Sequence, residues 1–210
     1  MHFHILVADE RHAIYAEEIV ETIFVAAQQR GTGIARRTPE YVIKKMTEGK
    51  AIIALTADSA TFAGFCYVET WEHGRYVANS GLIVKPEFRK HNLARKIKRA
   101  AFDLSRRKFP ESKIFGITTS AAVMKINSEL GYRPVAFADL TQDEDFWNGC
   151  RSCPNVDILE RTQRKMCLCT GMLFDPLAPV AFISAEDVAA SIADTSQLHL
   201  SLDASQEPTV

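Results

Sequence analysis

Basic side chains gather between an apolar run and the start of a helix. The apolar run covers residues 76–84, and the loop 89–91 (RKH) follows it. The helix that begins at Leu93 adds Arg95 in its first turn. The first N–H groups of a helix have no partner within the helix, and the helix dipole is positive there. The pattern therefore predicts a phosphate or pyrophosphate site made of main-chain N–H groups and basic side chains. A strand, a solvated basic loop and a surface helix without a ligand are the alternative interpretation.

Glu69 and His73 form a second candidate site near the end of the strand predicted over 62–71. If this strand continues regularly to residue 73, both side chains lie on one face, because side chains alternate along a strand. The two residues could then act as a general base and its proton relay. A polar strand end that enters a hairpin is the alternative interpretation.

Four of the five cysteines form two close pairs, Cys150 with Cys153 and Cys167 with Cys169. Four thiolates can close a tetrahedral zinc site, and an alternating strand would place Cys167 and Cys169 on one face. Buried free cysteines that pack as small apolar residues are more common. We therefore expect no metal, with a zinc site or a redox pair as the alternatives.

Composition places the chain among ordinary globular proteins. It has 210 residues, of which 47% are hydrophobic and 24% charged, and its formal net charge is −1. This balance gives no reason to expect a nucleic-acid partner. No apolar run approaches the roughly 20 residues of a membrane helix, and the first residues lack the layout of a signal peptide. We expect a cytoplasmic protein with reduced cysteines and no membrane partner, and a homodimer stays open.

Hydrophobic periodicity and turn residues divide the chain into a domain at 1–175 and a tail at 176–210 with one short helix at 185–193. Thr38 followed by Pro39 signals a helix start, and Gly131 signals a helix end. The order of elements is strand, two helices, three strands, helix, strand, helix and two strands, which favours an α/β sheet. The predicted strands are 3–7, 51–57, 62–71, 76–84, 113–118, 132–138 and 166–174, and the predicted helices are 12–29, 39–48, 93–108 and 121–130.

Two segments resemble motifs of the GCN5-related N-acetyltransferases. The loop Arg89-Lys90-His91-Asn92-Leu93-Ala94 is similar to the acyl-coenzyme A loop of that family, which reads Arg or Gln, two residues, Gly, one residue, and Gly or Ala. Asn92 stands at the first glycine position, and asparagine tolerates a positive φ better than other side chains. Residues 129–135 (ELGYRPV) resemble the family's LGFRPV segment. The resemblance covers about residues 3–174.

The resemblance implies an α/β (α+β) fold whose central mixed, mostly antiparallel sheet is flanked by helices and splayed at the acyl-coenzyme A site. It implies acetyl-CoA or another short acyl-CoA as co-substrate, no required metal, and direct transfer to a small-molecule amine. The cofactor-binding residues that it implies are Ile83, Val84, Arg89, Lys90, His91, Asn92, Leu93, Ala94, Arg95 and Asn127.

Two positions carry expectations about the chemistry. Main-chain N–H groups near Ile83 and Val84 would polarise the thioester carbonyl. Asn127 takes the place of a tyrosine that, in many family members, returns a proton to the leaving thiolate. An amide donates a hydrogen bond but is no acid at neutral pH, so a contact to the cofactor is the alternative role for Asn127.

A narrower resemblance concerns the acetyltransferase domain of N-acetylglutamate synthases. It rests on residues 33–38 (GIARRT), on Thr118 and Thr119, and on residues 161–165. By that resemblance Arg36, Arg37 and Arg164 would hold the two carboxylates of glutamate, an acceptor in arginine biosynthesis; solvated loop charge is the alternative. A succinyl donor, another small amine, a peptide N-terminus and a non-catalytic acyl-CoA sensor also stay open.

Overall fold

A computed structural model describes residues 1–31 and 37–178 of the chain. The chain divides into Met1–Pro176 and Leu177–Val210. The predicted helix at 185–193 lies outside the described residues. The strands are β1 (Phe3–Val7), β2 (Ala51–Thr56), β3 (Phe62–Trp71), β4 (Tyr76–Val84), β5 (Lys113–Thr118), β6 (Arg133–Val135) and β7 (Thr170–Phe174). The α-helices are α1 (Ala16–Arg30), α2 (Pro39–Thr47), α3 (Leu93–Lys108), α4 (Ala121–Glu129), α5 (Glu144–Asn148) and α6 (Val156–Arg161).

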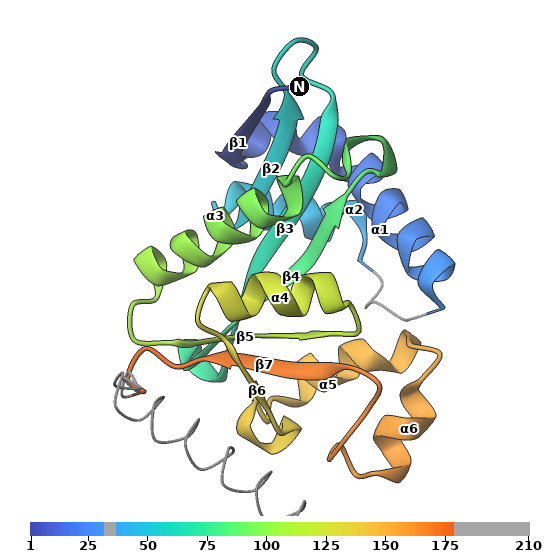
Figure 1. The fold of residues 1–210 in the computed structure, drawn as a ribbon, viewed down its shortest axis with the longest axis vertical. Helices are drawn as coiled ribbons and strands as arrows, with labels where there is room; N and C mark the ends of the chain where they lie inside the picture. The colour runs from blue at the N-terminus through green and yellow to red at the C-terminus, as the bar shows by residue number, and fades with distance from the viewer. Residues whose placement is uncertain (32–36, 179–210) are drawn as a thin grey trace, which may run out of the picture. The chain divides into compact units, whose positions relative to one another are not determined.

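The strands form one mixed sheet in the order β1-β2-β3-β4-β5-β7-β6 (Figure 1). Every neighbouring pair is antiparallel except β4 and β5, which are parallel. The β4–β5 ladder contains only the pairs from Tyr76–Lys113 to Ala78–Phe115. Beyond Ala78, β4 stays with β3 as far as Val84, whereas β5 continues beside β7. The sheet therefore splits between β4 and β5, as the predicted fold class requires.

A β-bulge in β4 sits beside this split. Phe65 pairs with Ile83 and Tyr67 pairs with Ser80. Between these two pairs β4 therefore contains one more residue than β3. The extra residue is accommodated at Gly81, whose φ is +64°. A Cβ at this position would lie 2.3 Å from Cε1 of Tyr67. Both the backbone angle and the close ring therefore require glycine here.

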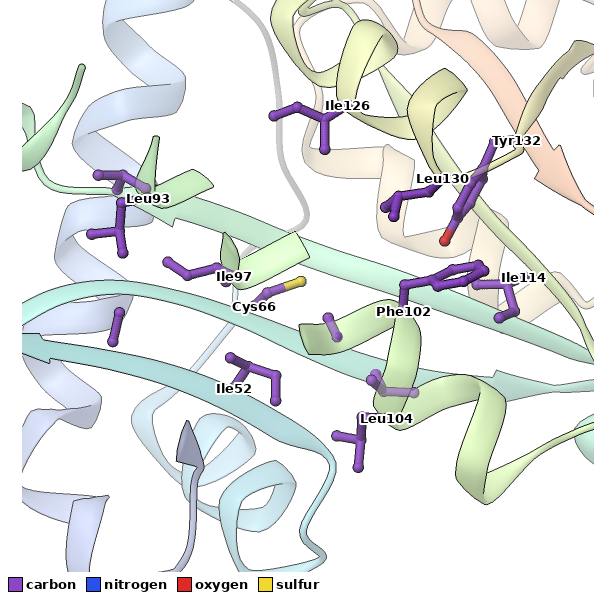
Figure 2. Packing of buried hydrophobic residues seen from close by; sticks show 14 of the residues in the cluster. Ile52, Cys66, Leu93, Ile97, Phe102, Leu104, Ile114, Ile126, Leu130 and Tyr132 are labelled. Carbon is purple, nitrogen blue, oxygen red and sulfur yellow. The ribbon is translucent and has the colours of Figure 1, made fainter. Parts of the chain in front are cut away.

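Helices cover both faces of the sheet. On one face α3 and α4 pack on residues of β2, β3 and β5, and they cross in front of the strands in Figure 1. Figure 2 shows Ile97 of α3 beside Ile52 and Cys66, with Ile126 and Tyr132 from the α4 side. On the other face α1 and α2 pack on β2 and β3 through a second cluster around Ile53 and Phe65. Successive residues of β3 therefore belong to different cores.

The helix start predicted at Thr38 and Pro39 is confirmed. The hydroxyl of Thr38 accepts from the N–H of Tyr41 (3.3 Å) at the start of α2. Ser120 caps α4 in the same way through the N–H of Val123 (3.4 Å). None of the helices within the described residues has the length and apolarity that spanning a membrane requires.

The prediction for the last third of the chain is partly wrong. Strand 132–138 shrinks to β6, because a 3-10 turn occupies Phe137–Asp139. The strand predicted over 166–174 begins only at Thr170. Between them lie α5 and α6, short helices that residue periodicity could not distinguish from loop because each spans fewer than two turns.

Replacing Gly81 with alanine should destabilise the protein by about 2 kcal/mol or more, because a Cβ adds both left-handed strain and a clash with Tyr67. Urea unfolding measures the change. Gly116 of β5 is the matched control, since its Cβ would meet nothing closer than the carbonyl oxygen of Asn79 at 3.8 Å. Gly116→Ala should stay within about 1 kcal/mol of the wild type. Equal losses in both variants would contradict the role of the bulge.

Candidate functional site

A cavity of about 260 Å³ lies at the split between β4 and β5. Its walls come from β3 (Tyr67, Glu69), β4 (78–82), α3 (Lys98), the end of β5 (116–120), α4 (Val123, Asn127), Arg37 and the segment between β6 and β7. Glu69 and Tyr67 lie on the α2 face of the sheet, while Asn127 and Lys98 belong to the helices of the opposite face. The cavity therefore joins the two faces through the opening in the sheet.

Glu69 is the acidic group of this cavity. The residue is 3% exposed, and its carboxylate accepts hydrogen bonds from Nη2 of Arg37 (3.3 Å) and from the hydroxyl of Tyr41. Nε of Arg37 also donates to the hydroxyl of Tyr67 (3.0 Å). Burial, and then the negative charge of Glu69, raise the pKa of Tyr41 and of Tyr67, so both phenols stay protonated at neutral pH. The carboxylate is held by two fixed donors.

His73 does not accompany Glu69, which corrects the expectation that they share a strand face. Strand β3 ends at Trp71, and Glu72–Gly74 form a turn in which Glu72 and His73 have φ values of 48° and 55°. His73 is exposed and does not line the cavity. The carboxylate of Glu72 instead ties the turn to Thr141 (2.8 Å).

The basic loop has the turn that the sequence predicts. Asn92 adopts the left-handed conformation (φ 58°, ψ 17°) and Lys90 also has a positive φ of 67°. No side chain caps the first turn of α3, in contrast to the hydroxyl caps of α2 and α4. The N–H groups of Leu93 and Ala94 therefore lack a capping side-chain oxygen, as an anion site requires.

The basic side chains around this loop have different partners. Nε of Arg89 donates to the carbonyl oxygen of Val84 (3.3 Å), and the exposed Arg89 side chain extends from there. The His91 ring lies 6.1 Å from the Phe3 ring, measured between centroids. Arg95 forms an ion pair with Glu129. The side chains of Ile83 and Val84 are buried, and the part of β4 that lines the cavity ends at Leu82.

Asn127 contributes a buried polar atom with no partner in the described part of the chain. The residue is 1% exposed and its Nδ2 contacts Sδ of Met172 at 3.6 Å. Its Oδ1 is buried and accepts no hydrogen bond. A buried acceptor that lacks a donor is unfavourable by about 1–3 kcal/mol. Because Asn127 lines the cavity, a ligand N–H placed there would satisfy this atom.

The residues predicted to hold acceptor carboxylates are dispersed. Arg37 lines the cavity, as do Thr118 and Thr119 at the end of β5. Arg36 lies outside the described residues. The side chain of Arg164 is 40% exposed, forms a bidentate ion pair with Glu144 (2.7 and 2.6 Å) and does not line the cavity. The arrangement of three arginines expected from the narrower resemblance is therefore not assembled among the described residues.

The four paired cysteines all line one end of the cavity. Cys167 and Cys169 precede β7 instead of alternating within it, so the strand argument for their convergence is wrong. Burial raises the pKa of Cys150 to about 11 and that of Cys169 to about 12, which keeps these thiols protonated. Within residues 1–31 and 37–178, no three His, Cys, Asp or Glu side chains are arranged to hold a metal ion.

Sequence reasoning missed three polar residues of this cavity. Tyr67 could have been found, because it stands two residues before Glu69 and shares its strand face. Asn79 and Lys98 are harder to find. Lys98 is 2% exposed although α3 is rich in solvated basic residues. It lies one turn before Ala101 and Phe102, which places it at the margin of the inward face, where a lysine can also extend to solvent.

Comparison with known proteins relates this geometry to solved structures. No protein-family model matches the sequence, and no curated protein matches it. An N-acetylglutamate synthase from Neisseria gonorrhoeae, solved with coenzyme A and N-acetyl-glutamate, superposes with a TM-score of 0.58 at 12% identity, over 85% of this chain and 36% of that one. The chain thus spans about a third of that enzyme.

Two other structures match over most of their own length. The protein YncA from Salmonella typhimurium, solved with its cofactor acetyl-CoA, has a TM-score of 0.56 at 16% identity, covering 86% of this chain and 99% of that one. An acetyltransferase of the GNAT family from Staphylococcus aureus has a TM-score of 0.53 at 13% identity, covering 68% and 91%. Together with the split sheet, these matches show that the chain has the fold of the GCN5-related N-acetyltransferases.

Proposed function

We propose that this protein is an acyl-CoA-dependent N-acyltransferase whose acceptor is the amine of an amino acid. The observation that carries the proposal is the cavity through the β4–β5 split, which has an unsatisfied acceptor, Asn127 Oδ1, on one side and a buried carboxylate, Glu69, on the other. Solved structures with the same fold contain coenzyme A or acetyl-CoA.

The α3 side of the split suits coenzyme A. The N–H groups at Leu93, Ala94 and Arg95 would hold the pyrophosphate, with positive charge from Arg89, Lys90 and His91. The inner edges of β4 beyond Ala78 and of β5 would flank the pantetheine, and Asn127 Oδ1 would accept from one of its amide N–H groups. The bound co-substrate supplies an acyl group activated as a thioester. We place the N–H groups that polarise its carbonyl in the bulged stretch 81–84.

The α2 side suits the acceptor amine. An incoming ammonium must lose a proton before it attacks, and Glu69 is the carboxylate that lines the cavity there. Its hydrogen bonds from Tyr41 and Arg37 fix its direction. Asn127 cannot supply a proton to the leaving group at neutral pH.

An amino-acid acceptor follows from the charges in the cavity. Arg37 offers a guanidinium next to Glu69, so a carboxylate and an ammonium carried on neighbouring atoms could each meet a partner. Glutamate is the first candidate, because the structure of a protein with this fold was solved with N-acetyl-glutamate. With glutamate as the acceptor, the protein would act in arginine biosynthesis. Acetyl is the first donor to test and succinyl the second.

Purified protein should release thiol from acetyl-CoA or succinyl-CoA when an amino acid is present, and mass spectrometry should find the N-acyl product. Amino acids are supplied one at a time, with glutamate first, and simple amines that lack a carboxylate serve as controls. Faster turnover of amino acids than of these amines supports the acceptor class. Binding of coenzyme A without turnover of any acceptor would point instead to a sensor.

Charge reversal at Arg89 should weaken binding of coenzyme A roughly tenfold to a hundredfold, the range expected for a hydrogen bond to a charged group. Isothermal titration at low salt measures the dissociation constant. Arg107→Glu provides the same charge change on an exposed residue in the last turn of α3. An Arg89→Glu protein that binds as tightly as this control would rule out the proposed pyrophosphate site.

Replacing Glu69 with glutamine keeps the shape and an acceptor oxygen for Tyr41 and Arg37 but removes the base. We expect kcat to fall by about 10²–10⁴, the usual contribution of a general base, with coenzyme A binding unchanged. His73→Gln, on the exposed turn, should leave kcat at the wild-type value. The assignment of Glu69 is wrong if kcat survives its substitution or falls equally in both variants.

A further inference from the structure

Lys98 is a buried lysine on the inner face of α3. Its side chain lines the cavity and only 2% of the residue is exposed. Its ammonium donates to Oδ1 of Asn79 (3.3 Å) and lies 5.0 Å from the centre of the Tyr132 ring. Among residues 1–31 and 37–178, no carboxylate pairs with it. Burying an ammonium without an acidic partner is unfavourable, so a lysine at this position calls for a functional explanation.

The surroundings of Lys98 leave its remaining protons available. Oδ1 of Asn79 also accepts from the hydroxyl of Tyr132 (3.1 Å), and Nδ2 of Asn79 donates to Oγ of Ser105 (2.8 Å). Ser105 in turn donates to the carbonyl oxygen of Ala101 (2.9 Å). This chain of bonds fixes Asn79 and uses one of the three ammonium protons. The other two have no acceptor among the described residues.

Lys98 stands at the vertex of the split. The last β4–β5 pair is Ala78 with Phe115, and Asn79 is the first β4 residue beyond it. Lys98 and Asn127 line the same cavity from α3 and α4, the two helices of one face. Glu69 reaches the cavity from the opposite face, next to Arg37. A thioester that enters between α3 and α4 would therefore have its sulfur near Lys98 and its carbonyl carbon toward Glu69.

We propose that Lys98 is the proton donor to the coenzyme A sulfur as the thiol leaves, a role that Asn127 cannot fill. The assignment rests on the proposed function. The amine nitrogen forms a bond to the acyl carbon, the C–S bond breaks and its electron pair stays on sulfur. The acceptor ammonium has by then lost its first proton to solvent through Glu69. The proton from Nζ of Lys98 moves to the sulfur, while the proton that the nitrogen loses as the amide forms passes to Glu69 and from there to solvent. Lys98 then recovers a proton from solvent when the products leave.

The protonation equilibria of the site agree with this role. Burial lowers the pKa of Lys98 to about 8, near the roughly 8.5 of a free thiol, where proton transfer to a thiolate is nearly balanced. The titratable groups that face it are Cys66 of β3 and Tyr132. Burial raises the pKa of Cys66 to about 11 and that of Tyr132 well above its usual value. Both neighbours are neutral at pH 8, where Lys98 is about half protonated, so the charge at the vertex comes from Lys98.

The test measures the thiol pKa of coenzyme A bound to the intact protein, from the ultraviolet absorbance of the thiolate as pH is raised. Desulfo-coenzyme A gives the background of the protein's own groups. Lys98→Met and Lys98→Gln remove the charge, and Arg107→Met removes a charge from the exposed face of the same helix. Relative to wild type and to Arg107→Met, both Lys98 variants should raise the bound thiol pKa by about one unit or more. With an acceptor, kcat should fall at least tenfold in both.

The possible results separate the role of Lys98 from the proposed function. A bound thiol pKa that is equal in all four proteins overturns the role of Lys98 and leaves the proposed function standing. Failure of the wild type to bind coenzyme A overturns both.

The pH dependence of the unfolding free energy tests whether Lys98 is buried. Because the pKa of Lys98 is lowered from 10.5 to about 8 in the folded state, the unfolded chain binds more protons between these values. Wild-type stability should rise with pH across that window, and a Lys98→Met protein with the same rise would also overturn the assignment.

Discussion

The early end of the β4–β5 ladder is the constraint on which the candidate site depends. Parallel pairing stops after Ala78 and Phe115 because β4 is held by β3 through its bulge while β5 is held by β7. The facing edges of the two strands beyond this point make no ladder with each other, yet they lie beneath α3 and α4. Backbone polar groups in such a place need partners. An extended ligand that carries amide groups, as pantetheine does, can supply them in the way that a peptide adds to a sheet edge.

The elements around the split could be predicted because their signals are local. Thr38 and Pro39 start α2, and Asn92 permits the left-handed turn before α3. Each of these residues acts on the backbone next to it, so its effect does not depend on the rest of the chain. The loop motif and the fold were accessible from the sequence for this reason.

The parts that could not be predicted depend on contacts between distant residues. His73 leaves the face of Glu69 because Glu72 turns to meet Thr141, some 70 positions along the chain. Arg164 leaves the cavity because Glu144 of α5 holds it. Lys98 looks like its basic neighbours in the sequence, and only the residues across from it, Asn79 and Tyr132, show that it faces inward. The helix period places Lys98 at the margin of the inward face, but it does not show whether the ammonium turns to solvent or to the cavity.

The sheet also separates the two charges that the proposed reaction needs. Glu69 and Lys98 line one cavity but belong to opposite faces, and Glu69 has Arg37 as its partner while Lys98 has a neutral amide. If the two groups touched, they would pair with each other and neither would face a substrate. With the strands between them, Glu69 faces the side proposed for the amine, next to Arg37, and Lys98 faces the side proposed for the sulfur. The split that admits the thioester thus also keeps the base and the acid apart until a substrate joins them.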